Sequence, residues 1–282
     1  MIAISLTNAG DLQVTQVMTS PAVYLDHWAL RLISEDAGFA ARLTSGLETR
    51  HGTLALSWVN LVEFVRVTVP EQIAQVEDLV EANLARLFLI EVDPFVVISR
   101  EDDLLAGGPR RPPHADGDFL RLLARINPRT VAPLSARGLF RGLHDPEVDQ
   151  RHTALPDAFI RSVEQLRLDA ANDPSLARAV RADPKGPPLQ AGTRFILREL
   201  VRPLVVDKGK QVTRNDAMDF FHAVVPLAYC DYVLLDKHWA AQVGHARFRF
   251  DETSMSVPMA AIFSRGPTGV KQLLHELSPS DI

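Results

Sequence analysis

This chain contains short hydrophobic runs. They are separated by longer stretches in which apolar residues recur at helical spacing. A short apolar run between turn residues is typical of a strand buried in a parallel sheet. The runs that fit this description are Ala22–Leu25, residues 53–58, 88–90 and 95–99, Tyr232–Leu235, and residues 259–263. Because the predicted strands alternate with helices, the pattern predicts an α/β fold with a mainly parallel central sheet flanked by helices.

The stretches between these strands have the spacing of amphipathic helices. Pro70 suits the first turn of one helix, and Thr213 or Asn215 can cap another. Pro203 is expected to interrupt a third helix. The predicted helices cover residues 28–33, 38–49, 60–67, 70–87, 119–126, 156–171, 192–206, 213–228 and 237–243. The part from about 100 to 156, which includes GGPRRPP, gives the weakest pattern.

Composition narrows the class of protein. The chain has 282 residues, of which 46% are hydrophobic and 23% are charged, as in ordinary globular proteins. A single cysteine, Cys230, excludes an internal disulfide framework and a cysteine-based zinc site. Neither a signal peptide nor a long apolar span is visible, so the expected location is the cytoplasm, with no membrane partner. The net charge of −5 argues against a protein that coats nucleic acid nonspecifically, but it is compatible with an acidic nuclease site.

Two aspartates directly follow predicted strands. Asp26 comes after AVYL, and Asp236 comes after YVLL. In open α/β sheets ligands gather beyond the carboxyl ends of the strands, so these two side chains can face one pocket. Each aspartate equally suits the N-cap of the helix that follows it.

Two further carboxylates are expected near the same edge. Glu63 lies on the helix after TLALSW, and its apolar neighbours favour an inward-facing side chain. Asp219 lies on the helix before YVLL, where Asp216, Asp219 and His222 recur close to one helical face. Gathered carboxylates repel one another unless a cation neutralises them, and their oxygens suit Mg²⁺ or Mn²⁺. The opposing interpretation makes Asp216 an early-helix charge and His222 a partly buried histidine with satisfied hydrogen bonds.

The order of these residues resembles the signature of the PIN-domain superfamily of metal-dependent ribonucleases. The matching segments are VYLDHWAL, LSWVNLVEF and NDAMDFFHAVVPLAYCDYVLLDKHW, which cover roughly residues 21–70 and 213–265. The family has an aspartate after the first strand, a glutamate on a helix after the second, an aspartate on a late helix and another after the fourth strand. These positions correspond here to Asp26, Glu63, Asp219 and Asp236. Asp216 and Asp231 are auxiliary candidates, and Asp231, which precedes a strand, also suits a structural role.

The resemblance implies a bacterial, metal-dependent endoribonuclease that hydrolyses RNA phosphodiester bonds. Asp26, Glu63, Asp219 and Asp236 would be both its catalytic residues and its metal ligands. Two Mg²⁺ or Mn²⁺ ions would position the attacking water and stabilise the leaving oxygen. The implied domain division is an N-terminal extension (1–20), a PIN-like core in two parts (21–99 and 191–282) and a large, mostly helical central insertion (100–190).

Two alternatives to the ribonuclease stay open. One is a catalytically inactive PIN-fold module that binds RNA or a protein. The other is an α/β phosphotransferase or phosphatase, which would place a second aspartate two residues after the first, where Trp28 stands. Walker A, GxGxxG, HExxH and GxSxG motifs are absent from the sequence.

An arginine-rich segment lies in the centre of the chain. Its candidates for contact with RNA are Arg110, Arg111, Arg121 and Arg125. Positive charge beside an acidic pocket can grip an RNA backbone, although a solvated, salt-bridged surface has the same composition. The expected partner is therefore an RNA substrate, and an antitoxin-like protein or a second copy of the chain are further candidates.

Overall fold

A five-stranded parallel sheet forms the centre of the computed structural model, which describes residues 2–6, 12–66, 69–109, 111–126, 135–184 and 192–278. The strands run in the spatial order β5-β4-β3-β6-β7, and every neighbouring pair is parallel. Their bounds are β3 Ala22–Leu25, β4 Thr53–Leu56, β5 Leu87–Leu89, β6 Tyr232–Leu235 and β7 Ala261–Ser264. The prediction of an α/β fold with a parallel central sheet is confirmed.

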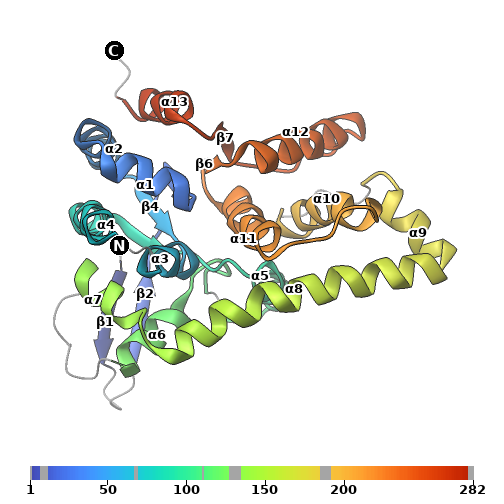
Figure 1. Cartoon of the computed structure of the whole chain (residues 1–282), viewed down its shortest axis with the longest axis horizontal. Helices are drawn as coiled ribbons and strands as arrows, with labels where there is room; N and C mark the ends of the chain where they lie inside the picture. Colours follow the sequence, from blue (N-terminus) through green and yellow to red (C-terminus); the bar gives the residue numbers. More distant parts are fainter. Residues whose placement is uncertain are drawn as a thin grey trace.

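Helices cover both faces of this sheet (Figure 1). One group packs together on one face: α1 His27–Glu35, α2 Ala37–Thr49, α4 Pro70–Ala82 and α13 Pro267–Leu277. A second group packs together on the other side: α5 Pro94–Leu105, α8 Pro146–Asn172, α10 Thr193–Val206, α11 Arg214–Tyr229 and α12 Lys237–Glu252. The short helix α3, Trp58–Val65, follows β4 directly, and a turn of 3₁₀ helix, Leu84–Arg86, precedes β5. Strands β3, β4 and β5 are buried along their whole length, because helices exclude water from both faces of the sheet.

The order of the strands creates a switch point between β3 and β6. From β3 the chain builds outward through β4 to β5, and it then returns to add β6 and β7 on the opposite side. In the register of this pair Leu25 lies opposite Leu234, so β3 ends one residue before the end of β6. Parallel sheets of this kind bind ligands in the crevice at the switch point, beyond the carboxyl ends of the strands.

The strand predicted at residues 95–99 is wrong. These residues lie in α5, which has Asp93 as its N-cap and Pro94 in its first turn. The Asp93 carboxylate accepts a hydrogen bond from Phe95 N at 2.9 Å, which satisfies a backbone donor at the start of the helix. The β-branched run FVVIS favoured a strand, but the Asp-Pro signal before it decides the local structure.

The N-terminal segment forms an antiparallel pair of strands, β1 Ile2–Leu6 and β2 Leu12–Gln16. The Gln16 side chain extends this pair toward the central sheet. Its amide donates to Leu89 O at 3.3 Å and accepts from Leu89 N at 2.7 Å, as a neighbouring strand would. The outer edge of β5 is thereby covered, which protects unpaired backbone groups from other chains.

The central region is mostly helical where the structure describes it. In addition to α8 it contains α6 Gly117–Ile126, α7 Ala136–Gly142 and α9 Pro174–Arg181. Helix α8 begins earlier than predicted, because Asp145 caps it and Pro146 occupies its first turn, and it runs on through Pro156. Helix α10 likewise continues through Pro203, where an interruption was predicted. None of the helices in the described residues is long and apolar enough to span a membrane. The division into an extension, a two-part core and an insertion stays a prediction.

Candidate functional site

Asp26 and Asp236 stand side by side at the switch point, each at the carboxyl end of its strand. Asp26 caps α1, and its Oδ1 accepts from His27 N at 2.6 Å. Asp236 caps α12, and its Oδ1 accepts from Trp239 N at 2.7 Å. The N-cap interpretation is thus correct for both residues. It does not compete with a role in a site, because each cap uses one carboxylate oxygen and leaves the second available.

Glu63 approaches Asp26 from α3. The start of this helix is fixed by a capping box, in which Ser57 and Asn60 each bond the other's backbone N–H. The side chain of Glu63 is 25% exposed, and its Oε2 lies 3.5 Å from Nε2 of His222. This oxygen is buried and has no hydrogen-bond partner. A buried carboxylate oxygen in this condition is costly unless a cation or a proton neutralises it.

Asp219 completes the group from α11. Asn215 donates to its Oδ2 at 2.9 Å. Burial, followed by the charges of Asp26 and Asp236, raises the pKa of Asp219 to about 7. The pKa of Asp26 rises to about 6 through burial, and Glu63 and Asp236 add to the rise. The structure therefore brings the four predicted carboxylates close enough to repel one another.

His222 lies within this acidic group, one turn after Asp219 on α11. Its Nδ1 lies 2.6 Å from the Tyr24 hydroxyl, and its Nε2 lies 4.0 Å from Asp26 Oδ1. Burial lowers the pKa of His222, but the charges of Glu63, Asp26 and Asp219 outweigh this and raise the pKa to about 9. The expectation of a satisfied histidine holds only for Nδ1, since Nε2 has no hydrogen-bond partner. The spacing of Asp219 and His222 in the sequence was the signal for its place in the site.

Two more histidines surround Glu63. The charge of Glu63 acts on both His27 and His152, although burial has the larger effect and lowers the pKa of each. His27 stacks near Phe64 at 4.5 Å between ring centroids, and its Nε2 has no partner. His152 comes from α8 and leaves both ring nitrogens without a partner. Sequence reasoning left His27 unassigned and missed His152, because nothing before the fold is known places α8 beside Glu63.

The two auxiliary aspartates are engaged elsewhere. Asp216 closes a capping box with Thr213 at the start of α11, and Lys210 bonds its Oδ1 at 2.9 Å. Asp231 accepts a hydrogen bond from Ala22 N at 2.6 Å. Ala22 begins β3, whereas Asp26 follows its end, so Asp231 lies at the opposite edge of the sheet. Both residues have structural roles that account for their positions.

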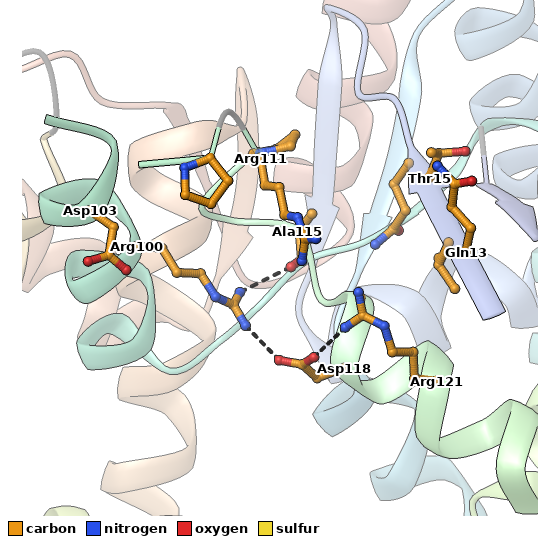
Figure 2. Close-up of a pocket in the computed structure, with 13 residues that line it drawn as sticks. Gln13, Thr15, Arg100, Asp103, Arg111, Ala115, Asp118 and Arg121 are labelled. Carbon is orange, nitrogen blue, oxygen red and sulfur yellow. Dashed lines mark hydrogen bonds and ion pairs between the residues drawn. The ribbon is translucent and has the colours of Figure 1, made fainter. Parts of the chain in front are cut away.

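An arginine-lined cavity of about 730 Å³ lies apart from the acidic cluster, between β2, α5 and α6 (Figure 2). Arg100, Arg111 and Arg121 line it, together with Asp103 and Asp118. Asp118 bridges two of these arginines, accepting from Arg100 at 3.0 Å and from Arg121 at 2.5 Å. The aspartates offset part of the positive charge of the lining.

The structure describes the side chains of two of the four arginines predicted to contact RNA. Arg111 and Arg121 line the cavity. Arg110 and the side chain of Arg125 lie outside the described residues. Arg100, which the sequence did not single out, also donates to the carbonyls of Pro113 and Ala115, both at 3.1 Å.

The acidic cluster has the donor chemistry of a site for a divalent cation. Its four carboxylates supply hard oxygen ligands, and one oxygen of Glu63 is buried and unpaired. Within the described ranges, no three His, Cys, Asp or Glu side chains are placed to hold a metal ion together. Binding a cation therefore requires side chains to move, and the partly exposed Glu63 and Asp219 can do so by changing rotamer. The residues fit the ion in the chemistry of their donor atoms.

Comparisons of the chain with protein-family models, with curated proteins and with solved structures find no match.

Proposed function

We propose that this protein is a metal-dependent endoribonuclease of the PIN-like type, which hydrolyses RNA phosphodiester bonds at the switch point. The observation that carries the proposal is the gathering of Asp26, Glu63, Asp219 and Asp236, in which burial and then the charges of the other carboxylates raise the pKa of Asp219 to about 7. In chain order these residues follow the first strand of the parallel sheet, lie on the helix after the second, lie on the helix before the fourth, and follow the fourth. That order is the one that the resemblance implies.

Each carboxylate has a defined part in this proposal. The two N-cap bonds fix Asp26 and Asp236 at the edge of the sheet, so that their second oxygens are available to a cation without any change of backbone. Glu63 and Asp219 close the site from α3 and α11. A bound Mg²⁺ or Mn²⁺ would neutralise the phosphate and lower the pKa of an attacking water. His27 and His152 wall the site beside Glu63 and limit the access of bulk solvent.

The arginine-lined cavity offers positive charge to an RNA backbone. Arg111 and Arg121 line it and are suited to contact phosphates. The side chains that lie between the cavity and the acidic cluster, Phe119, Trp58 and His152, are buried, so they connect the two places through the core.

The proposal is tested by cleavage of an end-labelled, mixed-sequence single-stranded RNA in the presence of Mn²⁺ or Mg²⁺. Wild-type protein is expected to cut the RNA, whereas Asp26→Asn and Asp236→Asn are expected to be inactive. Asparagine caps helices as well as aspartate does, so both variants should fold. Asp231→Asn is the matched control, because it makes the same substitution at the opposite edge of the sheet, and it should retain activity. If the wild type cleaves with neither ion, the proposal fails.

A second candidate function is a catalytically inactive module that binds RNA, an antitoxin-like protein or a second copy of this chain. The observation that favours it is the absence, among the described residues, of three side chains already placed to hold a metal ion. Such a module would bind the labelled RNA equally well in EDTA and in Mn²⁺, without cleaving it. The ribonuclease would lose cleavage in EDTA and regain it when Mn²⁺ is added.

A further inference from the structure

A buried nitrogen faces the acidic cluster without a hydrogen-bond partner. It is Nε2 of His222, whose side chain is 1% exposed. Its nearest charged neighbour is Glu63 Oε2, at ion-pair distance, so a metal ion bound here would displace the proton that joins the two side chains. The inference that follows rests on the proposed function and concerns which metal ion the site takes.

The distances around Nε2 are those of atoms that share an ion. Glu63 Oε2 lies 3.5 Å away and Asp26 Oδ1 lies 4.0 Å away. Two ligands that are each about 2.1 Å from a tetrahedral ion are separated by about 3.4 Å, and ligands at wider angles are separated by up to about 4.2 Å. Both contacts are too long for a strong hydrogen bond, and the Glu63 contact falls within the range for a common ion. Asp26 Oδ1 is held by its N-cap bond, so Asp26 would offer its second oxygen to the ion.

The other side of the imidazole ring is held in place. Nδ1 lies 2.6 Å from the Tyr24 hydroxyl and 3.4 Å from Asn60 Nδ2. The Tyr24 hydroxyl lies in turn 3.3 Å from Ser57 Oγ, so the chain of contacts ends in the capping box of α3. Metal-binding histidines characteristically have the second nitrogen fixed in this way, since it sets the orientation and tautomer of the ring.

The helix supplies a second ligand with the same orientation. Asp219 and His222 are three residues apart on α11, and side chains at this spacing lie on one helical face. The carboxylate–x–x–histidine arrangement places one oxygen and one nitrogen ligand toward the same pocket. Asp219 is partly exposed and held only by Asn215, so it can turn toward an ion that His222 binds.

We propose that His222 is a nitrogen ligand of the cation at the acidic cluster, and that the site therefore selects Mn²⁺, Co²⁺ or Zn²⁺ over Mg²⁺. Imidazole is a borderline ligand that suits transition-metal ions, whereas Mg²⁺ prefers oxygen ligands and water. A cluster of carboxylates alone would bind Mg²⁺ and Mn²⁺ by the same atoms. A nitrogen ligand from His222 makes the affinity of the site for Mn²⁺ higher than its affinity for Mg²⁺.

The direct test is electron spin-echo modulation of the full-length protein loaded with Mn²⁺. Directly coordinated imidazole gives a characteristic ¹⁴N modulation, which is expected in the wild type and expected to disappear in His222→Asn. Asparagine keeps a polar atom near the position of Nδ1 and removes Nε2. His27→Asn and His152→Asn are matched controls and should keep the modulation, because in the described structure the imidazole of His222, and not that of His27 or His152, lies within ion-pair distance of the carboxylates.

Calorimetric titration supplies a second readout. His222→Asn should weaken Mn²⁺ binding by about tenfold or more and Mg²⁺ binding by less than about threefold. Tyr24→Phe keeps the ring of His222 but removes its fixed partner, so it should weaken Mn²⁺ binding while the ¹⁴N modulation persists.

The outcomes separate this inference from the proposed function. Mn²⁺ bound to the wild type without imidazole modulation overturns the role of His222 and leaves the ribonuclease proposal standing. Modulation that persists in His222→Asn also overturns it, because another histidine is then the ligand. Failure of the wild type to bind Mn²⁺ at all overturns both proposals. Since the modulation of the wild type alone decides the first case, the test does not depend on the folding of any variant.

Discussion

Buried or half-buried carboxylates gather at two places in this molecule, and the charges that face them differ. Beside the arginine-lined cavity, Arg100 lies 3.5 Å from Glu91 and 3.0 Å from Asp118, and it also bonds two carbonyl groups. At the switch point, no lysine or arginine in the described chain lies within ion-pair distance of the four carboxylates, and the positive charge that faces them is that of His222, 3.5 Å from Glu63 and 4.0 Å from Asp26.

The contrast separates a structural network from a candidate reactive centre. Beside the cavity, arginine and backbone donors face the carboxylates, although burial and the charge of Asp116 still raise the pKa of Glu91. Carboxylates left to repel one another lower the stability of the fold, and proteins retain such groups where function requires them.

The largest expected effect is on RNA cleavage. Asp219→Asn should lower the rate by about 1000-fold, because it removes a charge that the bound cation needs. Asp118→Asn, the same substitution beside the cavity, should change the rate by less than about threefold at a saturating RNA concentration. The measurement is cleavage of labelled RNA in Mn²⁺. Equal losses of cleavage rate in the two variants would contradict the proposal that only the acidic cluster takes part in cleavage.

Removal of the central arginine of the cavity should give the largest effect on stability. Arg100→Met removes the arginine donor from Glu91, Asp118 and two carbonyl groups, and should lower the free energy of unfolding by about 3 kcal/mol. Arg121→Met is the control and should cost less than about 1 kcal/mol, because its pair with Asp118 is exposed. Urea unfolding followed by circular dichroism measures both. An Arg100→Met variant with the same free energy of unfolding as the wild type would contradict the structural role of this network.

The raised pKa of Glu91 predicts how the free energy of unfolding depends on pH. Burial and the charge of Asp116 raise the pKa of Glu91 from its ordinary value of 4.5 to about 8, against the opposing effect of Arg100. The folded protein therefore holds a proton that the unfolded chain has released, and stability should fall as the pH rises from 4.5 toward 8. Glu91→Gln should flatten that part of the profile, because glutamine has no proton to release. Urea unfolding at several pH values measures the slope, and an unchanged slope in Glu91→Gln would show that the group is not protonated in the fold.

The smallest expected effect is on the free energy of unfolding, which should change in opposite directions at the acidic cluster and beside the cavity. In EDTA, Asp219→Asn should raise the free energy of unfolding by about 1 kcal/mol, since it relieves repulsion among the carboxylates. Asp118→Asn should lower it by about 1 kcal/mol, since it removes the bridge between Arg100 and Arg121. Thermal unfolding of both variants compares the signs. Destabilisation by Asp219→Asn would mean that the cluster is neutralised within the fold itself.

The sequence predicted the sheet and the cluster for the same physical reason. Strand-end aspartates such as Asp26 and Asp236 are set by local structure, because a short buried strand must end where the helix after it begins. The parallel sheet then brings these ends together at one edge, so residues far apart in the chain meet without any knowledge of detailed packing.

The parts that the sequence did not predict depend on tertiary packing. His152 reaches Glu63 only because α8 packs against α3, and no local signal encodes that contact. The role of His222 could be seen as a spacing but not as an unpaired Nε2, which depends on Tyr24 holding the other side of the ring. The helix over residues 95–99 was missed because the apolar run outweighed the capping signal at Asp93.

Crystals grown with Mn²⁺ would test the central claim most directly, through an anomalous difference map collected near the manganese edge. The account predicts a peak at the switch point, within ligand distance of Asp26 and of at least two of Glu63, Asp219, Asp236 and His222. A map without a peak there, or with Mn²⁺ bound only beside the arginine-lined cavity, would contradict it.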